Sequence, residues 1–272
     1  MSKTRVLITV ATYPLPSRSY DELVCTAGVL EDGSWIRIYP VPFKFLEFHK
    51  YQWVELDLIP HKHSDDFRSE SHRPGQPDLS DLSVIRKLDT AQNWLERKEV
   101  CLKNVYTNLT RLIGDSKAPK NVSLAAFKPA KLRKFIVKDD DREWKEKWLE
   151  QLKQMDMLTS GRGHGDGPRI PVDKIPYKFK YQFDDDEGRS STMTIEDWEI
   201  GALYRNCLAA AEGDETTAVD KVREKYQTDF MNTKDITLFL GTTLEHHRKR
   251  HSNPFTIIGV FYPPRANQHE LF

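Results

Sequence analysis

The chain has 272 residues, and 41 Lys and Arg are balanced by 41 Asp and Glu, so its formal net charge is zero. This length allows one or two domains with sizeable cores. Zero net charge excludes long-range attraction of nucleic acid by the whole molecule, so any such site must be a local patch. No apolar stretch approaches the roughly 20 residues of a membrane span, and we expect no membrane contact.

The cysteines Cys25, Cys101 and Cys207 are odd in number and far apart in the sequence. This pattern argues against a disulfide framework and is typical of a reducing compartment. The N-terminus lacks the apolar segment and small-residue cleavage site of a signal peptide. We therefore expect a cytoplasmic protein.

The N-terminal segments 4–13, 22–30, 35–39 and 51–59 are predicted to be strands. They are rich in β-branched and aromatic residues, and turn-forming Pro or Gly residues follow or separate them. Four strands so close in sequence indicate a meander of a small barrel or an open sheet.

The strand 35–39 is the first candidate binding element. Its residues alternate, so Trp35, Arg37 and Tyr39 share the face opposite to the two isoleucines. Two flat rings beside a guanidinium suit a nucleobase and its phosphate. A strand buried on both faces would carry the same residues, because aromatic side chains pack well in sheets.

The middle of the chain is predicted to be helical. A polar loop, 60–83, is followed by a helix over 89–113, a basic connector over 128–138 and a second helix over 140–157. The glycine-rich segment 159–168 lacks the lysine and helix of a phosphate-binding loop, so we interpret it as a flexible linker.

The C-terminal part returns to strands. Residues 177–183 alternate, with an aromatic row on one face and Lys178 and Lys180 on the other. Helices are expected from Trp198 and over 214–230, and strands over 235–241 and 255–262.

These patterns predict an α+β fold, with two β-rich lobes (small barrel or open sheet) and a helical middle region. The expected domains are an N-terminal β-rich, OB-like domain (1–88), a helical segment (89–158) and a C-terminal α+β domain (159–272).

Candidate nucleic-acid-binding residues are the aromatic and basic side chains on predicted strands and loops. Each Lys or Arg that contacts a phosphate releases counterions, and aromatic rings stack on bases. The candidates are Trp35, Arg37, Tyr39, Lys44, Trp53, Arg68, Arg73, Lys178, Lys180, Arg248, Lys249 and Arg250.

A second hypothesis places a metal-dependent nuclease or nucleotide phosphoesterase in the loop 61–73. His61, His63, Asp65 and Asp66 bring imidazoles and carboxylates together there, as water-activating metal sites require. A solvated polar loop would have the same composition, and the histidines at 246, 247 and 251 lack a recognisable ligand spacing. We assign no metal, cofactor or catalytic residue, and the sequence favours a binding protein over an enzyme.

A family resemblance supports binding. The run from Val24 to Val29 (Val-Cys-Thr-Ala-Gly-Val), a hairpin, and then Gly33-Ser34-Trp35-Ile36-Arg37 resemble the opening of bacterial dual OB-fold (oligonucleotide/oligosaccharide-binding fold) proteins. The resemblance covers the N-terminal region only. In that family a proline often follows the Arg, whereas Ile38 follows it here. The resemblance implies nucleic-acid or nucleotide binding and no specific chemistry.

The first hypothesis is therefore a protein that binds single strands or irregular ends of DNA or RNA by aromatic stacking and basic backbone contacts. The metal-dependent enzyme is the second hypothesis, and a protein-interaction module within a larger complex is the third.

Overall fold

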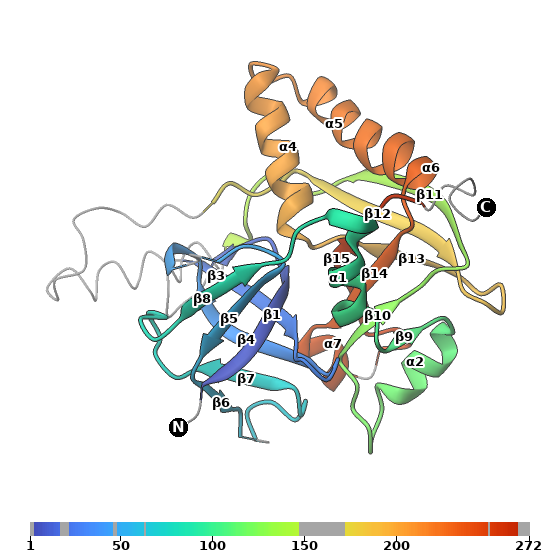
Figure 1. Cartoon of the computed structure of the whole chain (residues 1–272). Helices are drawn as coiled ribbons and strands as arrows, with labels where there is room; N and C mark the ends of the chain where they lie inside the picture. The colour runs from blue at the N-terminus through green and yellow to red at the C-terminus, as the bar shows by residue number, and fades with distance from the viewer. Residues whose placement is uncertain are drawn as a thin grey trace, which may run out of the picture.

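The computed structural model describes residues 3–16, 22–45, 48–62, 64–146, 172–249 and 251–265. The strands of its N-terminal lobe are Thr4–Ala11 (β1), Leu15–Pro16 (β2), Glu22–Val29 (β3), Trp35–Pro42 (β4), Gln52–Leu56 (β5), Leu58–Pro60 (β6), Ser71–Pro74 (β7) and Ser83–Lys87 (β8). They form one curled sheet in the order β6-β7-β4-β3-β1-β5-β8, with β2 paired to β3 (Figure 1). A short 3-10 helix, Phe43–Phe45, follows β4.

The C-terminal lobe contains two smaller sheets. Its strands are Val105–Tyr106 (β9), Leu124–Phe127 (β10), Lys131–Asp139 (β11), Tyr177–Asp184 (β12), Ser190–Thr194 (β13), Thr237–Thr242 (β14) and Phe255–Phe261 (β15). One sheet has the order β15-β14-β10-β9 and the other the order β11-β12-β13.

Helices cover the C-terminal lobe and connect the two lobes. They are Ala91–Cys101 (α1), Leu109–Asp115 (α2), Trp198–Ala210 (α4), Glu215–Arg223 (α5), a π-helical stretch Glu224–Asp229, Phe230–Thr233 (α6) and Leu244–Arg248 (α7). Figure 1 shows α4 and α5 as a helical pair above the three-stranded sheet. Among the described residues, no helix is both long enough and apolar enough to cross a lipid bilayer.

Three apolar clusters fill the molecule. One, with Val6, Ile36 and Ile38, lies within the curled sheet. Another packs the three-stranded sheet against α4 and α5. The third contains Trp53 of the N-terminal lobe together with Phe239 and other residues of the C-terminal lobe. The two lobes therefore share this third cluster as a common core.

The predicted mixed α+β architecture is confirmed, and so are the strands around β1, β3, β4, β12, β14 and β15. The prediction of a basic connector over 128–138 is wrong, because most of this segment forms strand β11. The helix over 89–113 is split into α1 and α2, with β9 between them. The predicted helix 140–157 falls mostly outside the described residues, and the linker 159–168 does so entirely.

Candidate nucleic-acid interface

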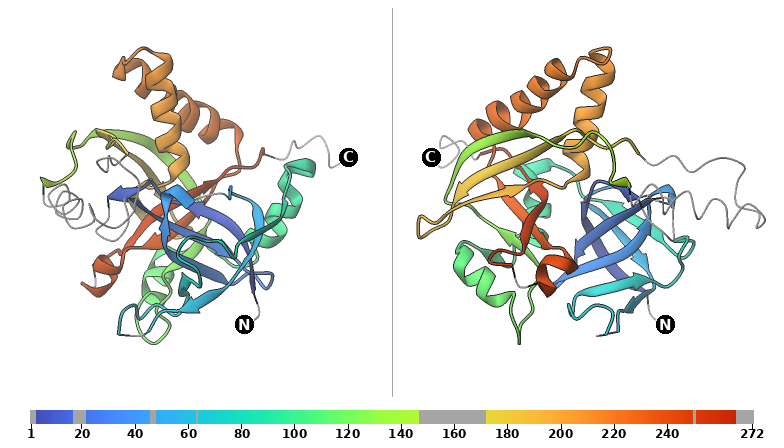
Figure 2. Two further views of the ribbon diagram at one scale, coloured as in Figure 1. Left: turned by 90° about the vertical axis from the view of Figure 1, so that its left-hand side faces the viewer. Right: turned by 180° about the vertical axis from the view of Figure 1, so that it is seen from behind.

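The outer surface of the three-stranded sheet carries a row of lysines from two strands. Strand β11 contributes Lys134 and Lys138, and β12 contributes Lys178 and Lys180. We call these four residues the cationic face. The view from behind in Figure 2 shows β11 and β12 side by side along this part of the molecule.

The register of the sheet brings like charges together. Lys138 pairs directly with Lys178, and Lys134 pairs with Gln182. Directly opposed side chains in antiparallel strands lie about 4.5–5.5 Å apart at Cβ, and like charges in such positions destabilise the sheet. On the far side of β12, Thr194 of β13 pairs with Lys180, so hydroxyl groups border the lysines.

The opposite surface of the same sheet is apolar and packs against the core, so the lysines lie on the outer surface. Phe135 of β11 and Phe179, Tyr181 and Phe183 of β12 are almost completely buried. Because side chains alternate along a strand, burial of this aromatic row directs the intervening lysines away from the core. The predicted aromatic row of 177–183 is thus confirmed.

The lysines differ in their ion pairs. The ammonium group of Lys178 lies 2.8 Å from Asp140 Oδ1, and that of Lys174 lies 2.8 Å from Asp140 Oδ2. Although burial opposes it, these lysines lower the pKa of Asp140 to about 2. Within the described ranges, Lys134, Lys138 and Lys180 form no ion pair, although Glu196 lies near enough to Lys178 and Lys180 for a favourable charge interaction.

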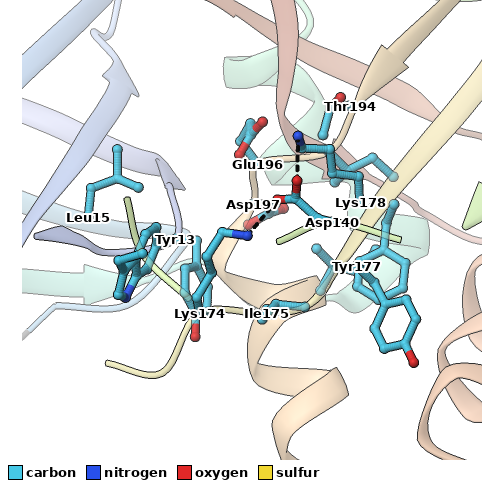
Figure 3. Close-up of a pocket in the computed structure, with 15 residues that line it drawn as sticks. Tyr13, Leu15, Asp140, Lys174, Ile175, Tyr177, Lys178, Thr194, Glu196 and Asp197 are labelled. Carbon is cyan, nitrogen blue, oxygen red and sulfur yellow. Dashed lines mark hydrogen bonds and ion pairs between the residues drawn. The ribbon is translucent and has the colours of Figure 1, made fainter. Parts of the chain in front are cut away.

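A cavity of about 110 Å³ lies at one end of the cationic face (Figure 3). Lys178 belongs to both the cationic face and the cavity wall, and Thr194, which pairs with Lys180, also lines the cavity. Tyr13 and Trp144 contribute aromatic rings, and Glu196 contributes a carboxylate. The cationic face therefore leads into a site with flat apolar walls.

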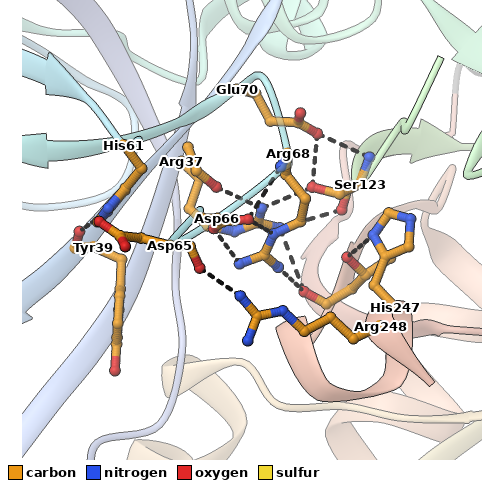
Figure 4. Close-up of polar contacts among 12 residues, drawn as sticks. Arg37, Tyr39, His61, Asp65, Asp66, Arg68, Glu70, Ser123, His247 and Arg248 are labelled. Carbon is orange, nitrogen blue, oxygen red and sulfur yellow. Dashed lines mark hydrogen bonds and ion pairs between the residues drawn. The ribbon is translucent and has the colours of Figure 1, made fainter. Parts of the chain in front are cut away.

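A second polar group lies between the lobes and is buried (Figure 4). The guanidinium of Arg37 donates to Ser123 Oγ at 2.7 Å and to the Ser123 carbonyl at 3.2 Å. It also donates to Ser71 Oγ at 3.3 Å. Glu70 Oε1 accepts hydrogen bonds from the backbone N–H and from the hydroxyl of Ser123. Ser123 thus connects Arg37 and Glu70 of the N-terminal lobe to the C-terminal lobe.

Arg68 makes a parallel connection. It donates two hydrogen bonds to the carboxylate of Asp66, at 2.8 and 2.6 Å, and one to the Thr242 carbonyl at 2.8 Å. Burial alone would raise the pKa of Asp66, but Arg68 and Ser71 outweigh it and lower that pKa to about 2. Asp66 therefore serves as the counter-charge of a buried arginine.

These contacts correct the expected roles of three candidate residues. Arg37, Trp53 and Arg68 are only 3%, 4% and 7% exposed, so they face the interior instead of a ligand. Trp35 is half-buried and packs edge-on against Phe239, with ring centroids 5.2 Å apart. Tyr39 is 43% exposed and remains accessible for stacking.

The other predicted basic residues are scattered over the surface. Lys44 and Arg73 are exposed on the N-terminal lobe. Arg248 donates to the Asp65 carbonyl at 2.7 Å, and Lys249 pairs with Glu245 at 2.6 Å. Arg250 lies outside the described residues. Of the predicted basic candidates, only Lys178 and Lys180 belong to the cationic face.

Sequence reasoning missed the other half of this face. Lys134 and Lys138 were placed in a connector, although they alternate with Phe135 and Val137 at the period of a strand. Glu196 was missed because a single carboxylate before a helix has no distinctive pattern.

The proposed metal site in the loop 61–73 gains no support from the contacts. Asp66 is committed to Arg68, and His63 lies outside the described residues. In the part of the chain that the structure describes, no group of three or more His, Cys, Asp or Glu side chains could hold a metal ion.

Comparison with known proteins places the chain in a family. Residues 107–272 match the family model "Domain of unknown function (DUF8757)". The chain belongs to this family. Residues 2–103 match a second model, "Domain of unknown function (DUF8758)". A search of curated proteins found no match.

Two solved structures show a weak overall likeness. A murine DNA-binding protein bound to double-stranded DNA has a TM-score of 0.34 and 9% identity, over 98% of each chain. The tetrameric p202 HIN2 structure has a TM-score of 0.30 and 9% identity, over 97% of this chain and 92% of that one. Similarity at this level carries no argument about function.

Proposed function

We propose that this protein binds single-stranded nucleic acid through the cationic face. The observation that supports the proposal most directly is the opposition of Lys138 and Lys178 on an exposed sheet surface. Asp140 compensates the charge of Lys178 in the free protein, and a bound polyanion would offset the repulsion that remains between the two lysines.

The neighbouring side chains suit a phosphate backbone. Gln182 lies beside Lys134 in the register, and Thr192 pairs with Gln182 from the other side. Amide and hydroxyl groups of this kind donate hydrogen bonds to phosphate oxygens. The chain has no net charge, so the affinity would come from this local face rather than from the whole molecule.

A single strand fits better than a duplex because the face leads into an aromatic-lined cavity. Tyr13 and Trp144 line that cavity, and only an unpaired base could reach it. Proteins that bind single strands commonly combine a basic track with aromatic rings that stack on bases.

Fluorescence anisotropy with labelled single-stranded DNA, single-stranded RNA and duplex DNA at low salt tests the proposal. The triple variant Lys134→Ala/Lys138→Ala/Lys180→Ala should bind the single strands roughly tenfold more weakly, or worse. Exposed lysines on other elements, changed as Lys62→Ala/Lys87→Ala/Lys117→Ala, provide a control with the same loss of charge. Equal affinity of the two triple variants would overturn the proposal.

The other two hypotheses have less support. The nuclease hypothesis used the carboxylates of the loop 61–73, and one of them, Asp66, is paired with Arg68; the hypothesis stays a prediction, to be tested by incubation with DNA, RNA and cyclic nucleotides in the presence of Mg²⁺ or Mn²⁺. The protein-interaction module stays a prediction, to be tested by co-purification of a stoichiometric protein partner.

A further inference from the structure

The cavity at the end of the cationic face has a definite chemical character. Tyr13 is held by a 2.7 Å hydrogen bond from its hydroxyl to the Asp173 carbonyl. The indole N–H of Trp144 donates to the Val172 carbonyl at 2.9 Å. Both rings are thus fixed in place, and fixed flat walls suit a planar ligand.

The polar groups of the cavity favour a hydrogen-bond donor over a phosphate. Lys174 and Lys178 are both engaged by Asp140. Glu196 is different, because its carboxylate lies in the cavity wall without a direct hydrogen bond or ion pair to another side chain of the described ranges. Burial raises the pKa of Glu196, whereas the positive charges of Lys178 and Lys180 lower it. Figure 3 shows Glu196 grouped with Thr194 and Lys178 on one side of the cavity. The group without a direct partner is therefore a carboxyl group whose oxygens can accept a hydrogen bond.

Glu196 also lies close to where a bound backbone would run. Thr194, the last residue of β13, pairs with Lys180, and Glu196 follows two residues later. Figure 3 shows Glu196 near Thr194 and Lys178. A nucleotide whose phosphate contacts Lys180 would then have its base beside the cavity.

We propose that the cavity receives one unstacked base carrying an exocyclic amino group, and that Glu196 accepts a hydrogen bond from this group. The inference rests on the proposed function and specifies its ligand further. Carboxylates recognise the amino group of cytosine, whereas thymine presents a carbonyl oxygen at the same position. Glu196 is thus a specificity-determining residue.

Two pyrimidine homopolymers of equal length, oligo(dC) and oligo(dT), test the inference by fluorescence anisotropy at neutral pH. The wild-type protein should bind oligo(dC) roughly tenfold more tightly. Glu196→Ala removes the acceptor, so this variant should lose the preference and keep its affinity for oligo(dT). Glu187→Ala, which removes an exposed carboxylate in the turn between β12 and β13, is the matched control and should keep the preference.

The outcomes separate this inference from the proposed function. Equal binding of both homopolymers by the wild type would overturn the role of the cavity and leave binding by the lysines intact. A preference that survives in Glu196→Ala would also overturn it. Binding of neither homopolymer at low salt would overturn the proposed function itself, together with the inference.

Discussion

Arg37 and Ser123 are 86 residues apart in the sequence, and the arginine donates hydrogen bonds to both the hydroxyl and the carbonyl of the serine. Both residues are buried, and they belong to different lobes. Loss of a buried charged donor leaves its acceptors without partners, which is costly in a low-dielectric interior.

Replacing Arg37 with Ala should therefore lower the free energy of unfolding by about 3 kcal/mol. Urea denaturation followed by circular dichroism measures this change. Arg73→Ala removes an exposed arginine from the same lobe and should change stability by less than about 0.5 kcal/mol. Similar losses in both variants would contradict the role assigned to Arg37.

Asp66 and its neighbour Asp65 offer a second matched pair. Asp66→Asn leaves the buried guanidinium of Arg68 without a counter-charge and should cost about 3 kcal/mol of unfolding free energy. Asp65→Asn changes an exposed carboxylate and should be nearly neutral. If urea midpoints of the two variants coincide, the Asp66–Arg68 pair does not stabilise the lobe interface.

His247 should make stability depend on pH. It is buried between the Ser116 carbonyl and Thr242 Oγ1, and burial, reinforced by Arg68 and Arg37, lowers its pKa. The folded state therefore binds a proton less readily than the unfolded state, and stability falls as the pH drops below about 6.5.

His247→Gln should flatten this fall in urea midpoint between about pH 7.5 and 5.5. His246→Gln, which changes the exposed neighbour, should keep the wild-type slope. If the urea midpoint of His247→Gln depends on pH as steeply as that of the wild type, the imidazole of His247 does not cause the loss of stability at low pH.

The strands of the N-terminal lobe were predictable because their alternation and turn residues are local signals. The burial of Arg37 was not, because its acceptors Ser123 and Thr242 come from distant segments. The five residues Trp35 to Tyr39 fit a binding strand and a buried strand equally well. Only the packing of the second lobe against that strand decides between them.

The cationic face, likewise, could be predicted only in part from the sequence. Lys178 and Lys180 were recognised from alternation within one strand, and Lys134 and Lys138 were not, because their partner strand lies beyond a long intervening segment. The many basic residues of 128–138 favoured the prediction of a connector. The segment forms a strand because β11 pairs with β12.

The salt dependence of binding should report the lysine contacts directly. Each lysine–phosphate contact contributes about −0.7 to the slope of log K against log salt concentration for single strands. Lys134→Ala/Lys180→Ala should therefore reduce the magnitude of the slope by about 1.4. An unchanged slope, measured by anisotropy between about 50 and 200 mM salt, would place the contacts elsewhere.

The most direct measurement is the affinity of Lys138→Glu for a single-stranded oligonucleotide, taken together with its urea midpoint. The new carboxylate lies opposite Lys178, whose ammonium group already pairs with Asp140, so the free energy of unfolding should change by less than about 1 kcal/mol. The same carboxylate repels phosphate, so affinity should fall roughly tenfold or more. Weaker binding by a fully stable variant is the predicted result, and unchanged affinity would contradict binding through the cationic face.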